Sequence, residues 1–227
     1  MPAFRPRTRE PRFSDRREAG RLLAAALSPL HRGRDAPLVL ALPRGGVPVG
    51  FEVADALGLE LDAFAVRKLG VPGHEQLAMG ALAAGGAIVI ERALVTRYGV
   101  DEATLDALIA RESLRLARRA RRLRGNRPGP ELDGRHLVLV DDGLATGSTM
   151  RAAIQAARAG DAARVTVAVP IAPAETCEEI REHADAVVCL RTPSPFYAVG
   201  VWYADFSPTS DAEAAELLRR AADRRER

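Results

Sequence analysis

The sequence predicts an α/β protein whose core is a mostly parallel, Rossmann-like sheet of about five strands flanked by helices. Short apolar runs alternate along the chain with longer segments of helical periodicity, an order typical of parallel sheets with right-handed crossovers. The runs are continuously apolar, which indicates strands buried on both faces. The predicted core strands are 37–42, 60–66, 136–140, 164–170 and 186–190.

Composition places the chain among ordinary globular proteins. Its 227 residues are 47% hydrophobic and 28% charged, and no apolar run approaches the roughly 18 residues of a membrane span. The first residues contain neither the apolar core of a secretory signal nor an unbroken amphipathic helix. Two cysteines, Cys177 and Cys189, are too few for a disulfide framework, so we expect a cytoplasmic protein. Four scattered histidines argue against a zinc enzyme.

The first half of the chain contains three predicted strands, two predicted helices and one irregular segment. Ser14 is a candidate cap for the first helix, and Gly58 ends the second. Glycines interrupt residues 70–86 without a clear period, so we expect a mobile loop there. In order, we predict a flexible tail at 1–12, helix 13–30, strand 37–42, helix 47–58, strand 60–66, the loop 70–86 and strand 87–91.

The second half begins with a long helix, 101–124, whose apolar stripe includes Leu105 and Leu116 and whose arginines lie mostly off that stripe. An aromatic-rich segment without regular pattern follows the last core strand. The remaining elements are strand 136–140, helix 148–159, strand 164–170, helix 174–183, strand 186–190 and a last helix from about residue 211.

Three loops with functional residue types follow three of the predicted core strands. They are PRGG at 43–46, RKLG at 67–70 and DDGLATGST at 141–149. Ligands of parallel α/β sheets bind beyond the carboxyl ends of the strands. We therefore expect these loops to form one site.

The loop 141–149 combines two acids with a pattern suited to an anion. A helix that starts near Ser148 presents free backbone N–H groups, Gly147 allows close approach, and nearby hydroxyls add donors. Asp141 and Asp142 would repel a phosphate, so we expect them to accept hydrogen bonds from vicinal sugar hydroxyls. The alternative is a strand-end acid pair before an ordinary capped helix.

The stretch VLVDDGLATGST at 138–149 resembles the signature of type I phosphoribosyltransferases, which bind 5-phosphoribosyl 1-diphosphate (PRPP). The resemblance implies that Asp141 and Asp142 bind the ribose hydroxyls. It assigns the 5′-phosphate to Ala145, Thr146, Gly147, Ser148 and Thr149. Gly143 departs from the branched aliphatic residue usual in the family. Relatives that act on 6-oxopurines carry an acid at the position of Ala145, which argues against a hypoxanthine/guanine enzyme.

LPRGG at 42–46 resembles the family's pyrophosphate loop, which often contains a strained or cis non-proline peptide. Gly45 and Gly46 can expose backbone N–H groups, and Arg44 offers a fork of donors; a plain strand-to-helix turn is the alternative. Arg67 and Lys68, at the end of the second strand, are the candidate catalytic cations that neutralise the leaving diphosphate. A solvated basic pair is the alternative there.

The loop 70–86 falls where the family carries its flexible catalytic loop. His74 and Glu75 could act there as acid/base groups, although loop residues of these types are usually only solvated. A diphosphate beside two carboxylates implies Mg²⁺ as cofactor, held mostly through PRPP and water, with Asp141 and Asp142 as indirect partners.

The acceptor site is the least defined part of the prediction. Phe196 and Trp202 belong to a local concentration of aromatic residues that could stack on a planar base, and packing of the last strand is the alternative. Within a single domain at 13–227, the core would span about 35–190, and a small hood would come from 13–34 and 191–227.

The segment 111–127 holds eight arginines and one glutamate. Such a charge could bind nucleic acid, but no aromatic residues interleave with it, and a solvated helix face explains it as well. The sequence thus predicts a magnesium-dependent phosphoribosyltransferase that acts on a nitrogenous base or amine, without a nucleic acid or membrane partner, and the resemblance suggests a homodimer. The alternative is a non-catalytic PRPP-sensing regulator that binds RNA through 111–127.

Overall fold

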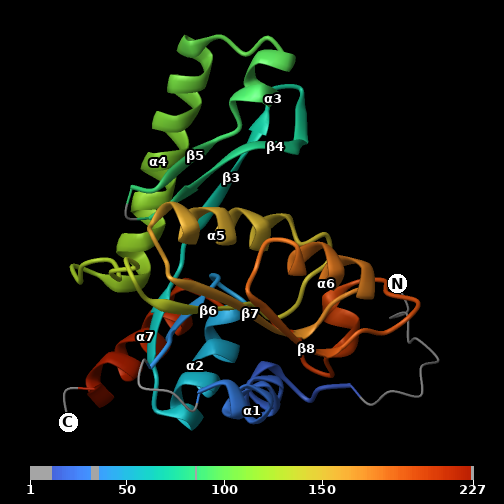
Figure 1. Ribbon diagram of the computed structural model, residues 1–227. Coiled ribbons are helices and arrows are strands. Elements are labelled where there is room, and N and C mark those ends of the chain that lie inside the picture. Colours follow the sequence, from blue (N-terminus) through green and yellow to red (C-terminus); the bar gives the residue numbers. More distant parts are fainter. Residues whose placement is uncertain (1–11, 32–35, 85, 226–227) are drawn as a thin grey trace.

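The computed structural model describes residues 12–31, 36–84 and 86–225, and its centre is a five-stranded sheet (Figure 1). The strand order is β2-β1-β6-β7-β8, and every neighbouring pair is parallel. The predicted fold class is therefore confirmed. The strands of this sheet are β1 (Leu38–Ala41), β2 (Glu60–Ala63), β6 (His136–Val140), β7 (Arg164–Ile171) and β8 (Ala186–Arg191).

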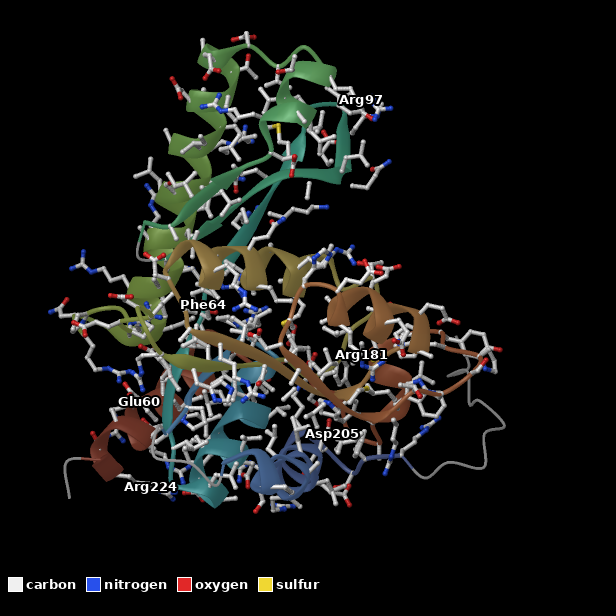
Figure 2. All side chains as sticks on the ribbon, viewed as in Figure 1. Glu60, Phe64, Arg97, Arg181, Asp205 and Arg224 are labelled. Atoms are coloured by element: carbon white, nitrogen blue, oxygen red, sulfur yellow. The ribbon has the colours of Figure 1, made fainter. Side chains whose placement is uncertain are left out.

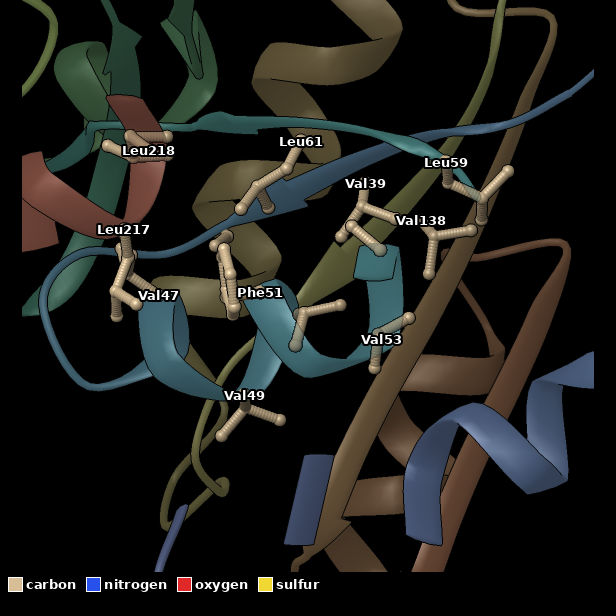
Figure 3. Packing of buried hydrophobic residues seen from close by; sticks show 14 of the residues in the cluster. Val39, Val47, Val49, Phe51, Val53, Leu59, Leu61, Val138, Leu217 and Leu218 are labelled. Carbon is tan, nitrogen blue, oxygen red and sulfur yellow. The ribbon is translucent and has the colours of Figure 1, made fainter. Parts of the chain in front are cut away.

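Helices cover both faces of the sheet because its strands are apolar on both faces. One face packs against α1 (Arg16–Leu27), α2 (Gly46–Leu57) and α7 (Asp211–Arg225), and Figure 3 shows Val39, Phe51 and Leu217 in this core. The other face packs against α5 (Ser148–Ala159) and α6 (Ala174–Arg181). The sheet is thus the middle layer of three.

The prediction of a mobile loop at 70–86 is wrong for the described residues, because most of that segment forms an antiparallel sheet. Its strands are β3 (Val66–Val71), β4 (His74–Ala83) and β5 (Ile88–Ile90). The predicted strand 60–66 accordingly ends at Ala63, and Phe64 lies buried in the link between the two sheets (Figure 2). Arg67 and Lys68 lie inside β3 and not at the end of a core strand.

The glycines that suggested mobility instead permit close strand pairing. A Cβ at Gly70 would lie 2.7 Å from the carbonyl oxygen of Glu75, and one at Gly80 would lie 2.4 Å from that of Val89. Side chains of this sheet pack with α3 (Arg92–Arg97) and α4 (Glu102–Arg124). Leu69 of β3 and Leu105 of α4, for example, belong to the same buried apolar cluster. These elements form a projecting lobe at the top of Figure 1.

Segments near the two ends of the chain meet beside the parallel sheet. Phe13 forms a β-bridge with Tyr203, next to the short 3-10 helix η2 (Val199–Trp202). Asp15, and not Ser14, caps α1, which continues into the 3-10 helix η1 (Ser28–His31). Residues 1–11 of the predicted tail lie outside the described residues. Among the described helices, none combines the length and the apolar character that crossing a bilayer requires.

Candidate active site

The loop 141–147, between β6 and α5, has a backbone geometry that suits the binding of an anion. Gly147 adopts a left-handed conformation, with φ of 67°, and is the residue from which α5 starts. A side chain there would be strained, and its Cβ would lie 2.9 Å from a methyl group of Thr176. Thr176 also donates to the carbonyl oxygen of Ala145 at 2.9 Å, which ties the loop to α6. Thr146 and Thr149 are exposed beside the helix start, whose first N–H groups have no partner within the helix.

The two acids follow β6 directly and lie beside this loop. One oxygen of Asp141 accepts a hydrogen bond from the backbone N–H of Asp142 at 2.9 Å. Asp142 forms an ion pair with Arg16, whose Nε and Nη2 both lie 2.8 Å from the same carboxylate oxygen, Oδ2. Tyr203 donates its hydroxyl to the backbone carbonyl of Asp142 at 2.6 Å. Oδ2 of Asp142 is therefore held by Arg16.

The loop 43–46 packs directly against the acids. A Cβ on Gly45 would lie 2.0 Å from Oδ2 of Asp142, and a Cβ on Gly46 would lie 2.9 Å from Cα of Asp141. Only glycine fits at either position, so the LPRGG pattern serves this contact. The peptide bond between Pro43 and Arg44 is cis, a feature that the resemblance to the pyrophosphate loop led us to expect.

Burial gives the acid pair unusual proton affinities. Burial raises the pKa of Asp141 well above its ordinary value, and the negative charge of Asp142 raises it further. Burial also raises the pKa of Asp142, although the guanidinium of Arg16 opposes the rise. Two such carboxyls titrate as a coupled pair. Perturbed, clustered acids of this kind are typical of functional sites.

A cleft of about 1040 Å³ lies between β3 and α4 and reaches Pro43 and Thr149, whereas Asp141, Asp142 and Arg44 are not among its described lining residues. The lining includes Pro43 from the loop 43–46, Thr149 from the first turn of α5, and Arg67 and Lys68 from β3. Arg67 is paired with Glu112 at 2.7 Å, and Nζ of Lys68 donates to the carbonyl of Gln76 at 3.0 Å. Arg44 lies 3.6 Å from Asp211 at the start of α7. The structure thus brings Arg67 and Lys68 to the same cleft as Pro43 and Thr149, although from a separate sheet.

Sequence reasoning missed two contributors to this region. The first is α4, whose arginines at 111, 115 and 119 also line the cleft. Their spacing of four residues places them on one helix face, and that signal was present in the sequence. The second is Arg16, which reaches Asp142 across 126 positions of the chain, so no local pattern could indicate the contact.

The remaining candidates lie at varied distances from the cleft. Glu75 lines it and accepts from the backbone of Gly73 at 3.2 Å, whereas the His74 ring packs on Tyr98 with ring centroids 5.2 Å apart. Phe196 is half-buried at the edge of a cluster that contains Trp202. Trp202 is fully buried, so in this conformation its ring offers no face to a base.

The acid pair supplies part of what a metal ion requires. The described residues contain no group of three or more histidine, cysteine or acidic side chains positioned to hold an ion. Asp141 and Asp142 nevertheless offer the hard oxygen donors that Mg²⁺ prefers. Such a pair fits an ion that takes most of its ligands from a bound phosphate compound and water.

The chain is similar to known proteins over most of its length. The family model described as "Phosphoribosyl transferase domain" matches residues 13–205. Two proteins of Mycobacterium tuberculosis, from strains CDC 1551 and H37Rv, are 47% identical over 209 residues. Both carry names that begin "Putative phosphoribosyl transferase". The match covers 92% of this chain and 47% of each relative, so the chain spans about half the length of these relatives.

A solved structure is similar over nearly its whole length. The crystal structure of TT1426 from Thermus thermophilus is 46% identical and superposes with a TM-score of 0.84. The match covers 92% of this chain and 98% of that one. The described arrangement of sheet, helices and projecting lobe therefore belongs to a fold that also occurs in a crystal structure.

Proposed function

This chain belongs to the phosphoribosyltransferase family, a class of transferases, and from that premise we propose that it moves the 5-phosphoribosyl group of PRPP to a nitrogenous base or amine. Diphosphate is the leaving group. The single observation that carries the proposal is the acid pair between two anion-binding features. Asp141 and Asp142 lie beside the start of α5 on one side and beneath Gly45 and Gly46 on the other.

Each part of PRPP has a matching partner in this arrangement. The 5′-phosphate would take the N–H groups and hydroxyls of 145–149, because a helix start favours an anion. The ribose hydroxyls would donate to Asp141 and to Oδ1 of Asp142, the oxygen that Arg16 does not hold. The diphosphate would lie against the loop 43–46 and the cations of the cleft, which include Lys68. The contact between Gly45 and Asp142 keeps these partners close together.

The residues then act mainly on charge and position. The acceptor nitrogen forms a bond to C1′ as the bond from C1′ to the diphosphate oxygen breaks, and the acceptor's proton passes to water. Negative charge grows on the diphosphate as it leaves, so fixed cations such as Arg44, Arg67 and Lys68 stabilise that state more than the ground state. Bound Mg²⁺, with Asp141 and Asp142 as its indirect partners, would supply further neutralisation of the diphosphate oxygens.

Several finer assignments belong to the proposal. Phe196, at the edge of the aromatic cluster, remains our candidate for contact with the acceptor base, whereas Trp202 would need to move to reach one. We also keep a hood built by the terminal segments, a homodimeric state, and a cytoplasmic setting in which Cys177 and Cys189 stay free thiols.

The test uses isotope-labelled PRPP with Mg²⁺ and a panel of nucleobases and amines. We expect transfer to at least one acceptor, with release of diphosphate. The double variant Asp141→Asn/Asp142→Asn keeps the size of both side chains and should lose PRPP binding, because each amide removes the negative charge and replaces one of the two acceptor oxygens with a donor. A double variant that binds PRPP as tightly as the parent would overturn the assignment.

The same experiment separates the alternative function. PRPP binding that depends on Asp141 and Asp142, with no transfer to any acceptor, would favour a sensing regulator. RNA binding by such a regulator would require the exposed arginines of α4, such as Arg118 and Arg121, and can be measured by the salt dependence of RNA affinity.

A further inference from the structure

One face of α4 carries a row of cations along the cleft. Arg111, Arg115 and Arg119 follow one another at intervals of four residues, and all three line the cleft together with Arg67 and Lys68. From first to last they span about 12 Å along the helix axis, which is longer than a single phosphate group. With Glu75 and Glu112 as the acids of the lining, the cleft has a net charge of +3.

Glu112 fixes part of this row in place. Its carboxylate is 6% exposed and lies 2.7 Å from Nε of Arg67, 3.1 Å from Nε of Arg111 and 2.8 Å from Nη1 of Arg115. One acid cannot neutralise three guanidinium groups, so donors are left over for another anion. The arginines themselves remain about half exposed, which leaves them accessible from the cleft.

Arg119 connects this row to the loop 43–46. Its Nη2 donates to the carbonyl oxygen of Pro43 at 3.0 Å, so the guanidinium lies beside the residue that precedes Arg44. Burial lowers the pKa of Arg119, and the positive charges of Arg44 and Arg67 lower it further. The carboxylate of Asp211, which lies 3.6 Å from Arg44, opposes this lowering, and an anion in the cleft would act on Arg119 in the same direction.

We infer that the cleft face of α4 is a binding surface for the diphosphate of the sugar donor, with Arg115 and Arg119 as its central residues. This inference rests on the proposed function. It adds a helix to the loops that the sequence motifs assign to the diphosphate. It also gives the arginine-rich segment a role other than RNA binding, because these arginines line a cleft shared with Thr149 and Pro43.

The test compares two double variants of the same helix. Arg115→Gln/Arg119→Gln removes two charges from the cleft face and leaves an uncharged amide donor at each position. Arg118→Gln/Arg121→Gln removes two charges from exposed positions that do not line this cleft. Binding of PRPP, inorganic diphosphate and ribose 5-phosphate is measured by calorimetry, with circular dichroism to confirm folding.

We expect the cleft-face variant to lose about tenfold or more in affinity for PRPP and for diphosphate, because charge-assisted bonds are lost. Its affinity for ribose 5-phosphate should stay unchanged, and the exposed-face variant should match the parent with all three ligands. Equal diphosphate binding by the parent and the cleft-face variant would overturn the inference. An equal loss with ribose 5-phosphate would also overturn it, since it would indicate a general structural effect.

Failure of the proposed function would give a different result. If the parent protein binds no PRPP, the proposed function falls. The comparison of diphosphate binding by the two double variants then still decides whether α4 forms an anion site.

Discussion

At the scale of single residues, one carboxylate oxygen of Asp142 contacts both Arg16 and the loop 43–46. Oδ2 of Asp142 lies 2.8 Å from two nitrogens of Arg16 and would lie 2.0 Å from a Cβ on Gly45. The side chains of Arg16 and Asp142 are only 11% and 15% exposed. The ion pair is therefore shielded from solvent, and its loss would leave a partly buried charge without a partner.

Replacement of Arg16 tests this contact. Arg16→Met should lower the free energy of unfolding by about 3 kcal/mol, the cost typical of an unpaired buried charge. It should also raise the pKa of Asp142, because burial raises that pKa and Arg16 opposes the rise. Ribose hydroxyls need an ionised acceptor, so the pH at which PRPP binding sets in should move upward. Urea unfolding and a pH series of PRPP titrations measure both effects.

A matched control comes from the same helix. Arg21 is 59% exposed and lies 3.7 Å from Glu52, so Arg21→Met should change the free energy of unfolding by less than about 0.5 kcal/mol. Superimposable pH profiles for Arg16→Met and the parent would contradict the role given to Arg16.

Gly45 provides a steric test of the same oxygen. Gly45→Ala should displace the carboxylate of Asp142 and weaken PRPP binding by about tenfold or more, because a Cβ cannot occupy a point 2.0 Å from Oδ2. Isothermal titration with PRPP measures the loss. In Gly129→Ala the new Cβ meets only Arg124, at an ordinary 3.5 Å, so this control should bind like the parent. If Gly45→Ala binds PRPP as tightly as the parent, close packing of the loop 43–46 on Asp142 is not needed for binding.

At the scale of elements, the structure separates what local pattern can predict from what it cannot. The acids, the helix start at Ser148 and the loop 43–46 lie within short stretches of sequence, so their residues could be identified from the sequence alone. The sheet β3-β4-β5 could not, because its glycines serve close strand approach, as Gly80 does against Val89. In isolation, such glycines resemble those of a mobile loop.

Helix α4 and strand β3 are held together by Glu112, and the stability that this contact provides should depend on pH. Burial alone would raise the pKa of Glu112, but hydrogen bonds from Arg111 and Arg67 outweigh it and lower the pKa below its ordinary value. A depressed folded-state pKa gives stability that is complete above the unfolded-state pKa of about 4.3 and is lost as the pH falls through the folded-state value.

Glu112→Gln should therefore be less stable than the parent at pH 7, by about 2 kcal/mol. The difference should shrink as the pH falls below about 4, since the parent then loses the same charge. Denaturant unfolding at several pH values gives the comparison. Glu102, 70% exposed in its pair with Arg92, supplies the control Glu102→Gln, for which we expect little change at any pH. A stability difference for Glu112→Gln that does not vary with pH would show that the ionised carboxylate of Glu112 does not hold α4 and β3 together.

At the scale of the whole molecule, the candidate site joins parts that fold in different cores. The loop 141–147 rests on the parallel sheet and α6, whereas Arg67, Lys68 and the arginines of α4 belong to elements that pack around the second sheet. The cleft between them is lined from both sides. A donor with a phosphate at one end and a diphosphate at the other matches this division, because each end can bind a different part of the molecule.

If one ligand binds both parts, a molecule that carries the phosphate and the diphosphate together should bind more tightly than either fragment. Ribose 5-phosphate would contact mainly 141–149, and inorganic diphosphate would contact mainly the cations of the cleft. PRPP carries both groups and loses its translational and rotational freedom only once, so its Kd should be at least about 100-fold lower than that of either fragment. At 100 times its Kd, PRPP should raise Tm by about 5 to 10 °C. Calorimetry and thermal unfolding with each ligand measure both quantities, and in Arg115→Gln/Arg119→Gln the Kd of PRPP should move toward that of ribose 5-phosphate by about tenfold or more. If PRPP and ribose 5-phosphate bind the parent equally well, the two parts do not act on one ligand.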